Sequence, residues 1–274
     1  MKRGVAGLAG SLFIGGLLIA VPPRVPLDAE AGSRVLASAE RLQYKVKWLF
    51  FRLGTITAST DRLPGSGDLY RTAISLDSNP DLFFISIHNR YEAIIRLNPI
   101  RCEAFISREA DGDDTLVTRY IFVDSLKQIL MTQQMLPADT LVREEVRVGI
   151  DRFFEGASLI VLARSLVHRD TSVSVPTLVD FDLFPTDITF PSTVRSVSIG
   201  ALKAPVRTRE LFGKADFGGK TIGGFSGDFK GWFSDDIAAI PILAEMSITL
   251  GTVDVELEQW SREGWEPPLV PSKP

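Results

Sequence analysis

The sequence predicts a mainly β protein, in which one strongly curved antiparallel sheet or incomplete barrel wraps around a single central helix. Most segments alternate apolar and polar residues, which is typical of strands with one dry and one wet face. Turn residues interrupt these segments at a spacing of roughly ten residues, as in β sandwiches, barrels and curved sheets. One long segment, residues 153–167, is apolar without alternating and predicts the helix.

The first predicted strand shows the alternation clearly. Its apolar positions are Tyr44, Val46, Trp48 and Phe50, with lysines between the first three. A similar run occupies residues 242–257, and its phase changes at Gly251. Glycine takes the positive φ that a tight turn requires, so Leu250-Gly251-Thr252 predicts a hairpin between two antiparallel strands. The same tripeptide at Leu53-Gly54-Thr55 predicts an equivalent hairpin near the start.

The segments between these hairpins are predicted to be short strands joined by turns. Loops are expected at residues 63–68, 78–81 and 111–114, and a glycine-rich loop at residues 218–227. Residues 82–87 form an apolar run too short to assign to helix or strand by its period. No linker divides residues 40–261, which are expected to form a single β-rich domain.

The predicted central helix covers about residues 152–167. Asp151 is the expected N-cap, and His168 and Arg169 follow where positive charge interacts favourably with the helix dipole. Polar side chains are sparse around this segment, so an apolar surface must cover it. We expect that surface to be the concave face of the sheet.

The two ends of the chain are expected to lie outside the β domain. Lys2 and Arg3 precede an uncharged run, residues 4–21, in the order typical of an export signal. Residues 1–31 are therefore predicted to be an export signal or an N-terminal membrane anchor, because the run is long enough for either. The alternative is a buried N-terminal helix. The proline-rich residues 262–274 are predicted to be a disordered tail.

The charged residues followed by an uncharged run at the N-terminus predict a location outside the cytoplasm. The protein is expected in the periplasm, or in the inner membrane with its domain facing the periplasm. If the N-terminal segment is not cleaved, that segment is expected to contact the membrane.

Two clusters of residues bracket the domain. They are Tyr44-Lys45-Val46-Lys47-Trp48 with Leu53-Gly54-Thr55, and Trp232, Ser234-Asp235-Asp236, Ile240-Pro241 and Leu250-Gly251-Thr252. These clusters resemble the opening and closing strand pairs of a bacterial family, the domain of unknown function 3108. The resemblance implies an exported, mostly antiparallel β domain, and it supplies no catalytic residues.

The composition predicts an ordinary globular core and argues against nucleic acid as the main partner. Of the 274 residues 45% are hydrophobic and 23% are charged, and the net charge is −4. No run of Lys or Arg forms a basic stripe. Cys102 is the single cysteine, so no intramolecular disulfide can form, and we expect it to be a small buried hydrophobe.

Sequences that resemble catalytic or ligand motifs are incomplete. Gly219-Lys220-Thr221 lacks the first glycine of a phosphate loop, because Lys214 holds that position. The acidic loop after Asp111 lacks the closing glutamate of a calcium loop, where Phe122 stands. The sequence therefore predicts that the protein is not an enzyme and that it holds no metal or cofactor.

Asp235 and Asp236 are adjacent acids in the closing cluster. Neighbouring strand residues point to opposite faces, so we expect this pair in a turn, where carboxylates cap backbone amides. A hydrolase would require one of them to meet Glu245, His88 or a metal in a cleft.

The function predicted from these features is a non-enzymatic binding or carrier module of the cell envelope for a lipid or other apolar ligand. Curved β folds offer elongated apolar pockets at their mouths. The candidate lining residues are Trp48, Phe50, Phe83, Phe84, Trp232 and Met246. The alternative is a structural or assembly factor that binds a protein partner in the envelope through exposed strand edges or the glycine-rich loop.

Overall fold

The computed structural model describes residues 29–82, 86–221, 225–248 and 251–270. These residues form one large antiparallel sheet of 15 strands that does not close on itself. The predicted class, a mainly β protein built on one large antiparallel sheet, is confirmed.

The first half of the sheet contains eight strands that follow each other along the chain. They are β1 (Glu40–Trp48), β2 (Phe51–Arg62), β3 (Leu69–Ser78), β4 (His88–Leu97), β5 (Ile100–Asp111), β6 (Asp114–Val123), β7 (Gln128–Leu136) and β8 (Thr140–Val148). The second half contains β9 (Thr171–Val179), β10 (Asp182–Phe190), β11 (Val194–Val197), β12 (Val206–Ala215), β13 (Gly227–Ser234), β14 (Pro241–Ile248) and β15 (Gly251–Arg262).

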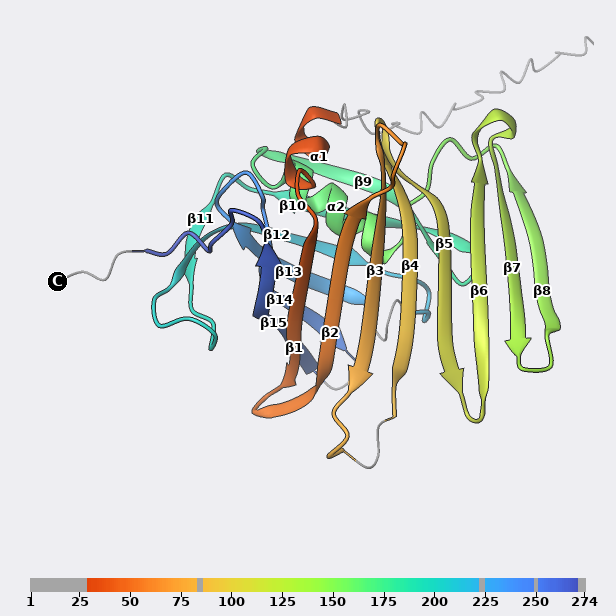
Figure 1. Cartoon of the computed structure of the whole chain (residues 1–274), viewed down its shortest axis with the longest axis horizontal. Helices are drawn as coiled ribbons and strands as arrows, with labels where there is room; N and C mark the ends of the chain where they lie inside the picture. The colour runs from red at the N-terminus through yellow and green to blue at the C-terminus, as the bar shows by residue number, and fades with distance from the viewer. Residues whose placement is uncertain (1–28, 83–85, 222–224, 249–250, 271–274) are drawn as a thin grey trace, which may run out of the picture.

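The two halves are joined in the middle of the sheet by β1 and β15. The spatial order is β8-β7-β6-β5-β4-β3-β2-β1-β15-β14-β13-β12-β10-β9, and β11 pairs with β12. Figure 1 shows β1 to β8 side by side in a front layer, with the strands of the second half crossing behind them. The sheet therefore folds over on itself, and a helix lies between the two layers.

That helix is α2 (Gly156–Leu166), which begins later than predicted. Its N-cap is Glu155 and not Asp151, because the Glu155 carboxylate accepts hydrogen bonds from the amides of Ala157 and Ser158, both at 2.8 Å. The Ser158 hydroxyl oxygen accepts in return from the Glu155 amide at 2.9 Å. This reciprocal capping box fixes the start of the helix.

A second short helix, α1 (Ala29–Val35), packs against α2. The connection from β6 to β7 contains one turn of 3₁₀ helix, η1 (Asp124–Leu126). The described part of the chain thus holds two short α-helices, and the prediction of a single central helix is not confirmed.

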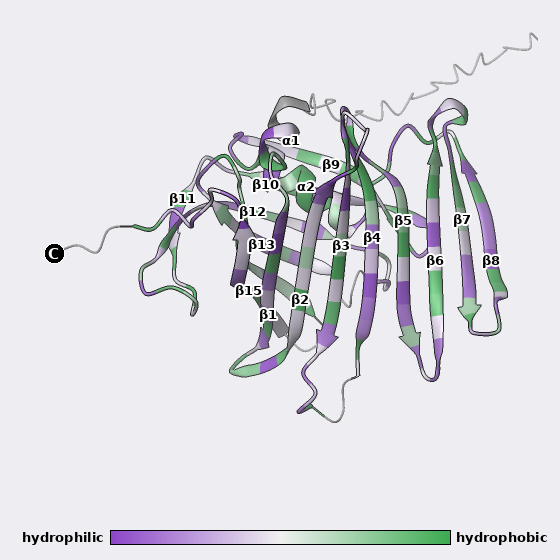
Figure 2. Cartoon of the chain, in the orientation of Figure 1, coloured by the Kyte–Doolittle hydropathy of each residue, from purple (hydrophilic) through white to green (hydrophobic). Residues whose placement is uncertain are grey.

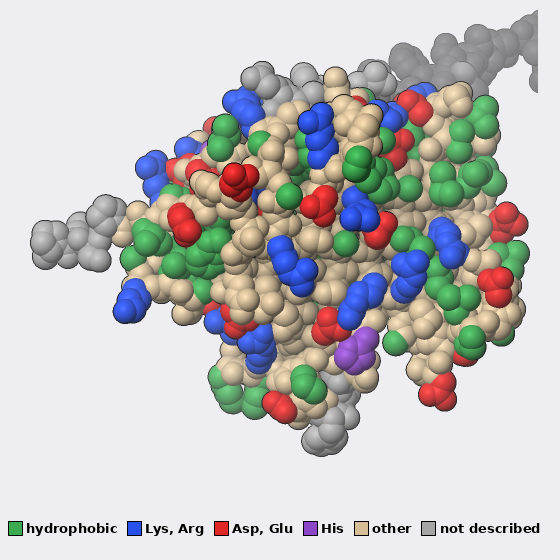
Figure 3. All heavy atoms as spheres, viewed as in Figure 1, with side chains coloured by type: hydrophobic (Ala, Val, Ile, Leu, Met, Phe, Trp, Pro, Cys, Tyr) green, Lys and Arg blue, Asp and Glu red, His purple; other side chains and the backbone are tan. Residues whose placement is uncertain are grey.

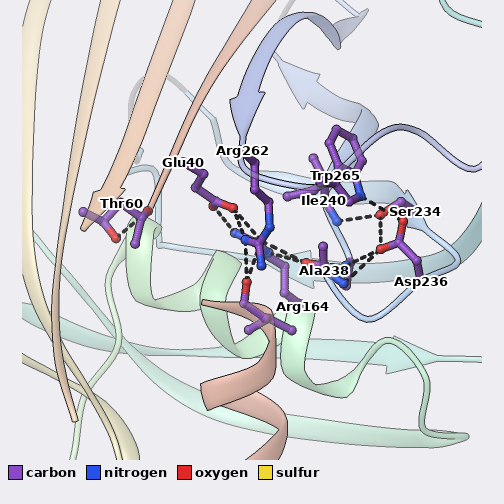
Figure 4. A network of polar contacts seen from close by, with 12 residues as sticks. Glu40, Thr60, Arg164, Ser234, Asp236, Ala238, Ile240, Arg262 and Trp265 are labelled. Carbon is purple, nitrogen blue, oxygen red and sulfur yellow. Dashed lines mark hydrogen bonds and ion pairs between the residues drawn. The ribbon is translucent and has the colours of Figure 1, made fainter. Parts of the chain in front are cut away.

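Both helices are tied to the sheet by a buried charge network (Figure 4). The Arg164 guanidinium, from α2, donates to the Glu40 carboxylate on β1, to the Val35 carbonyl at 3.1 Å and to the Ala238 carbonyl at 2.9 Å. Arg262, on β15, donates to Val35 and Glu40 as well. A buried carboxylate needs such partners, because an unpaired buried charge costs several kcal/mol.

The two predicted hairpins exist, but they are not equivalent. Trp48 pairs with Phe51, so the first turn consists of Leu49 and Phe50 and lies earlier than predicted. Gly54 lies inside β2, where the Asp77 carbonyl of β3 leaves no room for a Cβ atom. In the second hairpin Ile248 pairs with Gly251, whose φ is 119°, and the two linking residues lie outside the described residues.

The alternation predicted for the strands is visible along the ribbon of the first half of the sheet (Figure 2). Figure 2 shows polar and apolar bands following each other along β1 to β8. On β1 the residues at even numbers from Glu40 to Val46 are buried, whereas Arg41 is exposed and Gln43 and Lys45 are half-buried. Leu42 and Tyr44 of this set belong to a buried apolar cluster with Ile242 and Leu257, so period-two patterning identified the core face of this strand.

The sheet has two edges, at β8 and at β9. The β9 edge is covered, because Phe154 lies beside it and its amide donates to the Pro176 carbonyl at 2.9 Å. The Leu178 amide donates back to the Phe154 carbonyl at 2.8 Å. Within the described residues no further strand pairs with β8.

The end of the chain differs from the expected disordered tail. The Trp265 indole donates to the Asp236 carboxylate at 2.9 Å, and Trp265 is buried. Beyond it, Arg207 donates to the Pro268 carbonyl at 2.8 Å, and Leu269 bridges to β12. Proline carbonyls can accept although the ring nitrogen cannot donate, so this segment packs against the sheet as far as residue 270. Residues 271–274 lie outside the described residues.

The predicted export segment also lies outside the described residues as far as residue 28, and α1 begins at Ala29. Among the helices of the described ranges, none has the length and apolar character needed to cross a bilayer.

Candidate functional site

The face against which α2 packs is the inner face of the sheet. Close to α2 its side chains are buried, including Tyr70, Ala93, Ile95 and Leu97, all at most 6% exposed. Other apolar side chains on the same face are only half-buried, and two of them, Ile74 and Phe229, pack against the buried cluster that contains α2. We call this set the inner wall, and it consists of Trp48, Ile56, Ile74, Leu76, Phe229 and Met246.

Strand register brings part of the inner wall into one continuous row. Trp48 of β1 pairs with Val253 of β15, which pairs with Met246 of β14, which pairs with Phe229 of β13. Paired residues in a ladder share a face, so the row runs across four strands. The Trp48 indole nitrogen also lies 3.8 Å from the point where a Cβ on Gly251 would be. The row therefore lies at the base of both end hairpins.

The predicted ligand-binding residues are brought together only in part. Trp48 and Met246 lie in this row. Trp232 pairs with Leu243 and points to the opposite, outer face, so it cannot line the same surface. Phe50 is 82% exposed in the first hairpin turn, away from the inner wall. Phe83 and Phe84 lie outside the described residues.

An aromatic stack on the inner face was not predicted. The stack consists of Tyr91, Phe105 and Tyr120, from β4, β5 and β6. The ring centroid of Phe105 lies 6.3 Å from that of Tyr91 and 5.4 Å from that of Tyr120. Tyr120 then meets the edge of Phe153 at 6.4 Å and of Phe181 at 5.9 Å. Rings at these separations and angles attract beyond simple burial. The stack extends the apolar surface from the inner wall toward β6.

One end of this stack carries a carboxyl group. Glu109 lies on β5 and is half-buried, and its side chain hydrogen-bonds Ser107. Burial raises the pKa of Glu109, and the nearby Asp180 carboxylate adds to the effect. Burial also raises the pKa of Tyr91 to about 12, with the Glu109 charge contributing. These groups could hydrogen-bond the polar end of an otherwise apolar molecule.

The two adjacent aspartates have separate structural partners. Asp236 accepts hydrogen bonds from the Ala238 and Ala239 amides at 2.9 Å and 3.1 Å, which confirms the predicted capping turn for this residue. Asp235 instead pairs with Arg207 and Arg209, both at 2.7 Å. Among the contacts of the described residues, neither aspartate meets Glu245 or His88.

Other candidate chemistry is likewise structural. Cys102 is fully buried as predicted, and burial raises the pKa of its thiol far above the usual range. Among the described residues no three His, Cys, Asp or Glu side chains gather closely enough to hold a metal ion.

A groove of about 580 Å³ lies on the second half of the sheet. Most of its lining side chains point outward from β10 and β12 to β15, and its charged residues are Asp187, Lys214, Asp228, Lys230 and Glu245. Acids and lysines lie on neighbouring strands here, so the groove is mixed in charge, although most of its exposed lining is apolar. The inner wall, by contrast, contains apolar side chains only.

The open sheet with a half-covered inner face defines a β-barrel-like class of protein. The chain is similar to the crystal structure of a β-barrel-like protein of the domain of unknown function 1849 from Brucella abortus, with a TM-score of 0.54. Sequence identity is 10%, and the match covers 82% of this chain and 98% of that chain. At this identity the similarity concerns the fold alone.

No family model matches the chain, and no curated protein matches it. The resemblance to the domain of unknown function 3108 therefore stays a prediction.

Proposed function

We propose that this protein is a non-enzymatic binding or carrier module of the cell envelope for a lipid or other apolar ligand, held against the inner wall. One observation carries the proposal. On a single face of one sheet, the apolar side chains near α2 are buried, whereas those of the inner wall keep part of their surface exposed. A ligand that covered them would complete the burial that α2 begins.

The physical driving force is the removal of apolar surface from water, worth about 25 cal/mol for each Å² covered. The half-buried members of the row, Trp48, Met246 and Phe229, offer such surface on β1, β14 and β13. Tyr91 and Phe105 of the aromatic stack add to it on β4 and β5. Glu109 and Tyr91 add hydrogen-bonding groups, so a chain-like ligand with one polar end fits the arrangement best.

The binding test uses Met246, which is half-buried in the row. In Met246→Gln the side chain keeps its length but becomes polar, so we expect the affinity for a fluorescent fatty acid to fall about tenfold. Phe212→Gln is the matched control, because Phe212 is 45% exposed on the outer face. Equal affinity of the two variants, or failure of the parent to bind the probe, would count against the inner wall.

The subcellular location of the domain is part of the same proposal. Residues 1–31 are proposed to export the chain, so that the domain acts outside the cytoplasm. A reporter enzyme that is active only after export, fused after Pro274, should be active, and it should lose activity when Lys2 and Arg3 are retained but residues 4–21 are deleted. Activity that persists without residues 4–21 would contradict export through this segment.

A second candidate function, binding of a protein partner, is favoured by a different surface. Ile121, Leu130 and Val146 pair in register across β6, β7 and β8, and all three are exposed on the outer face, at 48%, 39% and 51%. Figure 3 shows hydrophobic side chains gathered over these strands. Because β8 is also a sheet edge, an extended segment of a partner protein could add to it as a further strand.

Site-specific photocrosslinking tests this second candidate. A photoreactive residue in place of Val146 should give one discrete protein adduct in cells of the source organism, whereas the same residue in place of Ile160, 41% exposed on α2, should not. The absence of an adduct at both positions would leave the ligand-binding proposal as the better account.

A further inference from the structure

The turn of the first hairpin displays three consecutive large apolar side chains. Leu49, Phe50 and Phe51 are 70%, 82% and 46% exposed, and the two phenylalanine rings lie 4.3 Å apart between centroids. We call these three residues the apolar tip. Figure 3 shows hydrophobic side chains at the lower end of the molecule, where Figure 1 places the turn between β1 and β2.

The conformation of this turn does not call for these residues. Trp48 pairs with Phe51, so Leu49 and Phe50 form a two-residue loop, and Leu49 has a φ of 54°. Glycine, asparagine and aspartate are the residues that such loops favour, because they adopt positive φ most readily. Leucine is unfavourable at the positive φ of position 49, and both side chains are unfavourable when exposed to water. Their presence therefore points to a contact outside the chain.

The small size of the apolar tip favours a lipid bilayer over a protein as its partner. A stable protein interface needs about 800 Å² on each side, which a two-residue turn standing out from the sheet does not offer. A lipid bilayer accepts a small protruding group, because apolar and aromatic side chains partition into its interface region. The cations behind the tip are already paired, Lys47 with Glu256 and Arg52 with Glu258, so attraction to anionic headgroups is not required.

We propose that the apolar tip inserts into the surface of a lipid bilayer. The contact goes beyond ligand binding, since the tip lies outside the inner wall. Trp48 connects the two, because it belongs to the inner wall and directly precedes Leu49. Insertion of the tip would therefore place that end of the inner wall next to the bilayer.

The experiment uses the full chain with an environment-sensitive fluorophore at the tip. Cys102 is fully buried, so a cysteine introduced by Phe50→Cys can be labelled selectively with a nitrobenzoxadiazole group. With protein-free phosphatidylcholine vesicles we expect its emission to rise and shift to the blue. The matched control is Ile237→Cys. Ile237 is 63% exposed and precedes Ala238, which Arg164 joins to Glu40 at the start of β1. The tip follows the other end of β1, so the control position is distant from it. The emission of the control should not change.

A second variant separates insertion by the tip from attachment by the N-terminal segment. Leu49→Asn with Phe51→Thr, added to the Phe50→Cys chain, removes the apolar groups and gives residues that suit a turn and a strand. The emission change at position 50 should then need at least about tenfold more lipid. No change at position 50 in the first chain, an equal change at position 237, or the same lipid dependence in the second variant would each overturn the proposal. A response that requires membrane proteins in the vesicles would overturn it too and would assign the tip to a protein partner.

Discussion

At the scale of single residues, the buried network around Glu40 holds the two helices to the sheet. One carboxylate receives hydrogen bonds from Arg164 and Arg262, and both guanidiniums also donate to backbone carbonyls. Such a group of charges is stable only while it is complete, because removing one partner leaves the others buried and uncompensated.

Glu40→Gln should therefore lower the free energy of unfolding by about 3–5 kcal/mol in urea titrations. The matched control is Arg195→Gln. Arg195 pairs with Glu210 at 3.6 Å and its side chain is 62% exposed, so its loss should cost at most about 1 kcal/mol. Similar losses for the two variants would show that the network contributes no more than a surface ion pair.

The environment of Glu109 makes the stability of the protein depend on pH. Its pKa is raised by burial, so the folded protein binds the proton more tightly than the unfolded chain does. The contribution of Glu109 to stability is then fully present at low pH and is lost as the pH rises through the folded-state pKa.

Relative to Glu109→Gln, the parent should gain stability when the pH is lowered from 7 to 5. Urea unfolding at the two pH values measures this difference. Glu144→Gln, at an exposed position on β8, is the control and should show no such gain. A relative loss of stability in the parent on acidification would mean that the Glu109 carboxylate, and not the neutral acid, is favoured by the fold.

At the scale of elements, α2 depends on the cap at its buried start. The Glu155 carboxylate satisfies two amides that have no partner within the helix, and both lie away from water. Glu155→Ala should cost about 2 kcal/mol of unfolding free energy, because the cap is lost and two buried donors stay unpaired. Glu155→Gln keeps one acceptor oxygen and should lose less. Equal stability of Glu155→Ala and the parent would show that water replaces the cap.

These elements were predictable from the sequence to different degrees, for physical reasons. The alternation around Tyr44 and Met246 identified strands and their core faces, because a strand with one buried face must repeat every second residue. The start of α2 was misplaced, since Glu155 is an uncommon N-cap and Asp151 is a common one. The first turn was assigned to Gly54, because glycine usually marks a turn, whereas here it lets two strands approach closely.

The sequence predicted only those residues of the candidate site whose orientation follows from the alternation within one strand. Trp48 and Met246 follow from the alternation within their own strands. The stack of Tyr91, Phe105 and Tyr120 depends on the register of three strands, and a bulge between Ile94 and Ile95 shifts that register. No local pattern in the sequence reveals such a shift, so the stack could not be predicted.

At the scale of the whole molecule, the sheet folds over itself and α2 fills only part of the enclosed face. Burial at one end and partial exposure at the other give the inner wall its proposed role, and the apolar tip extends the same end toward a bilayer. The pattern of alternating strands predicted the open sheet, but not how far the helix would cover it, because coverage depends on packing between segments distant in sequence.

The most direct test of ligand binding at the inner wall is photolabelling with a fatty acid that carries a diazirine near the end of its chain, followed by peptide mass spectrometry. The account predicts labels on Ile74, Leu76 and Met246, and their loss when unlabelled fatty acid is added in excess. Two results would contradict it. One is labelling confined to the outer face, at Ile121 or Val146, and the other is the absence of any labelling that excess unlabelled fatty acid suppresses.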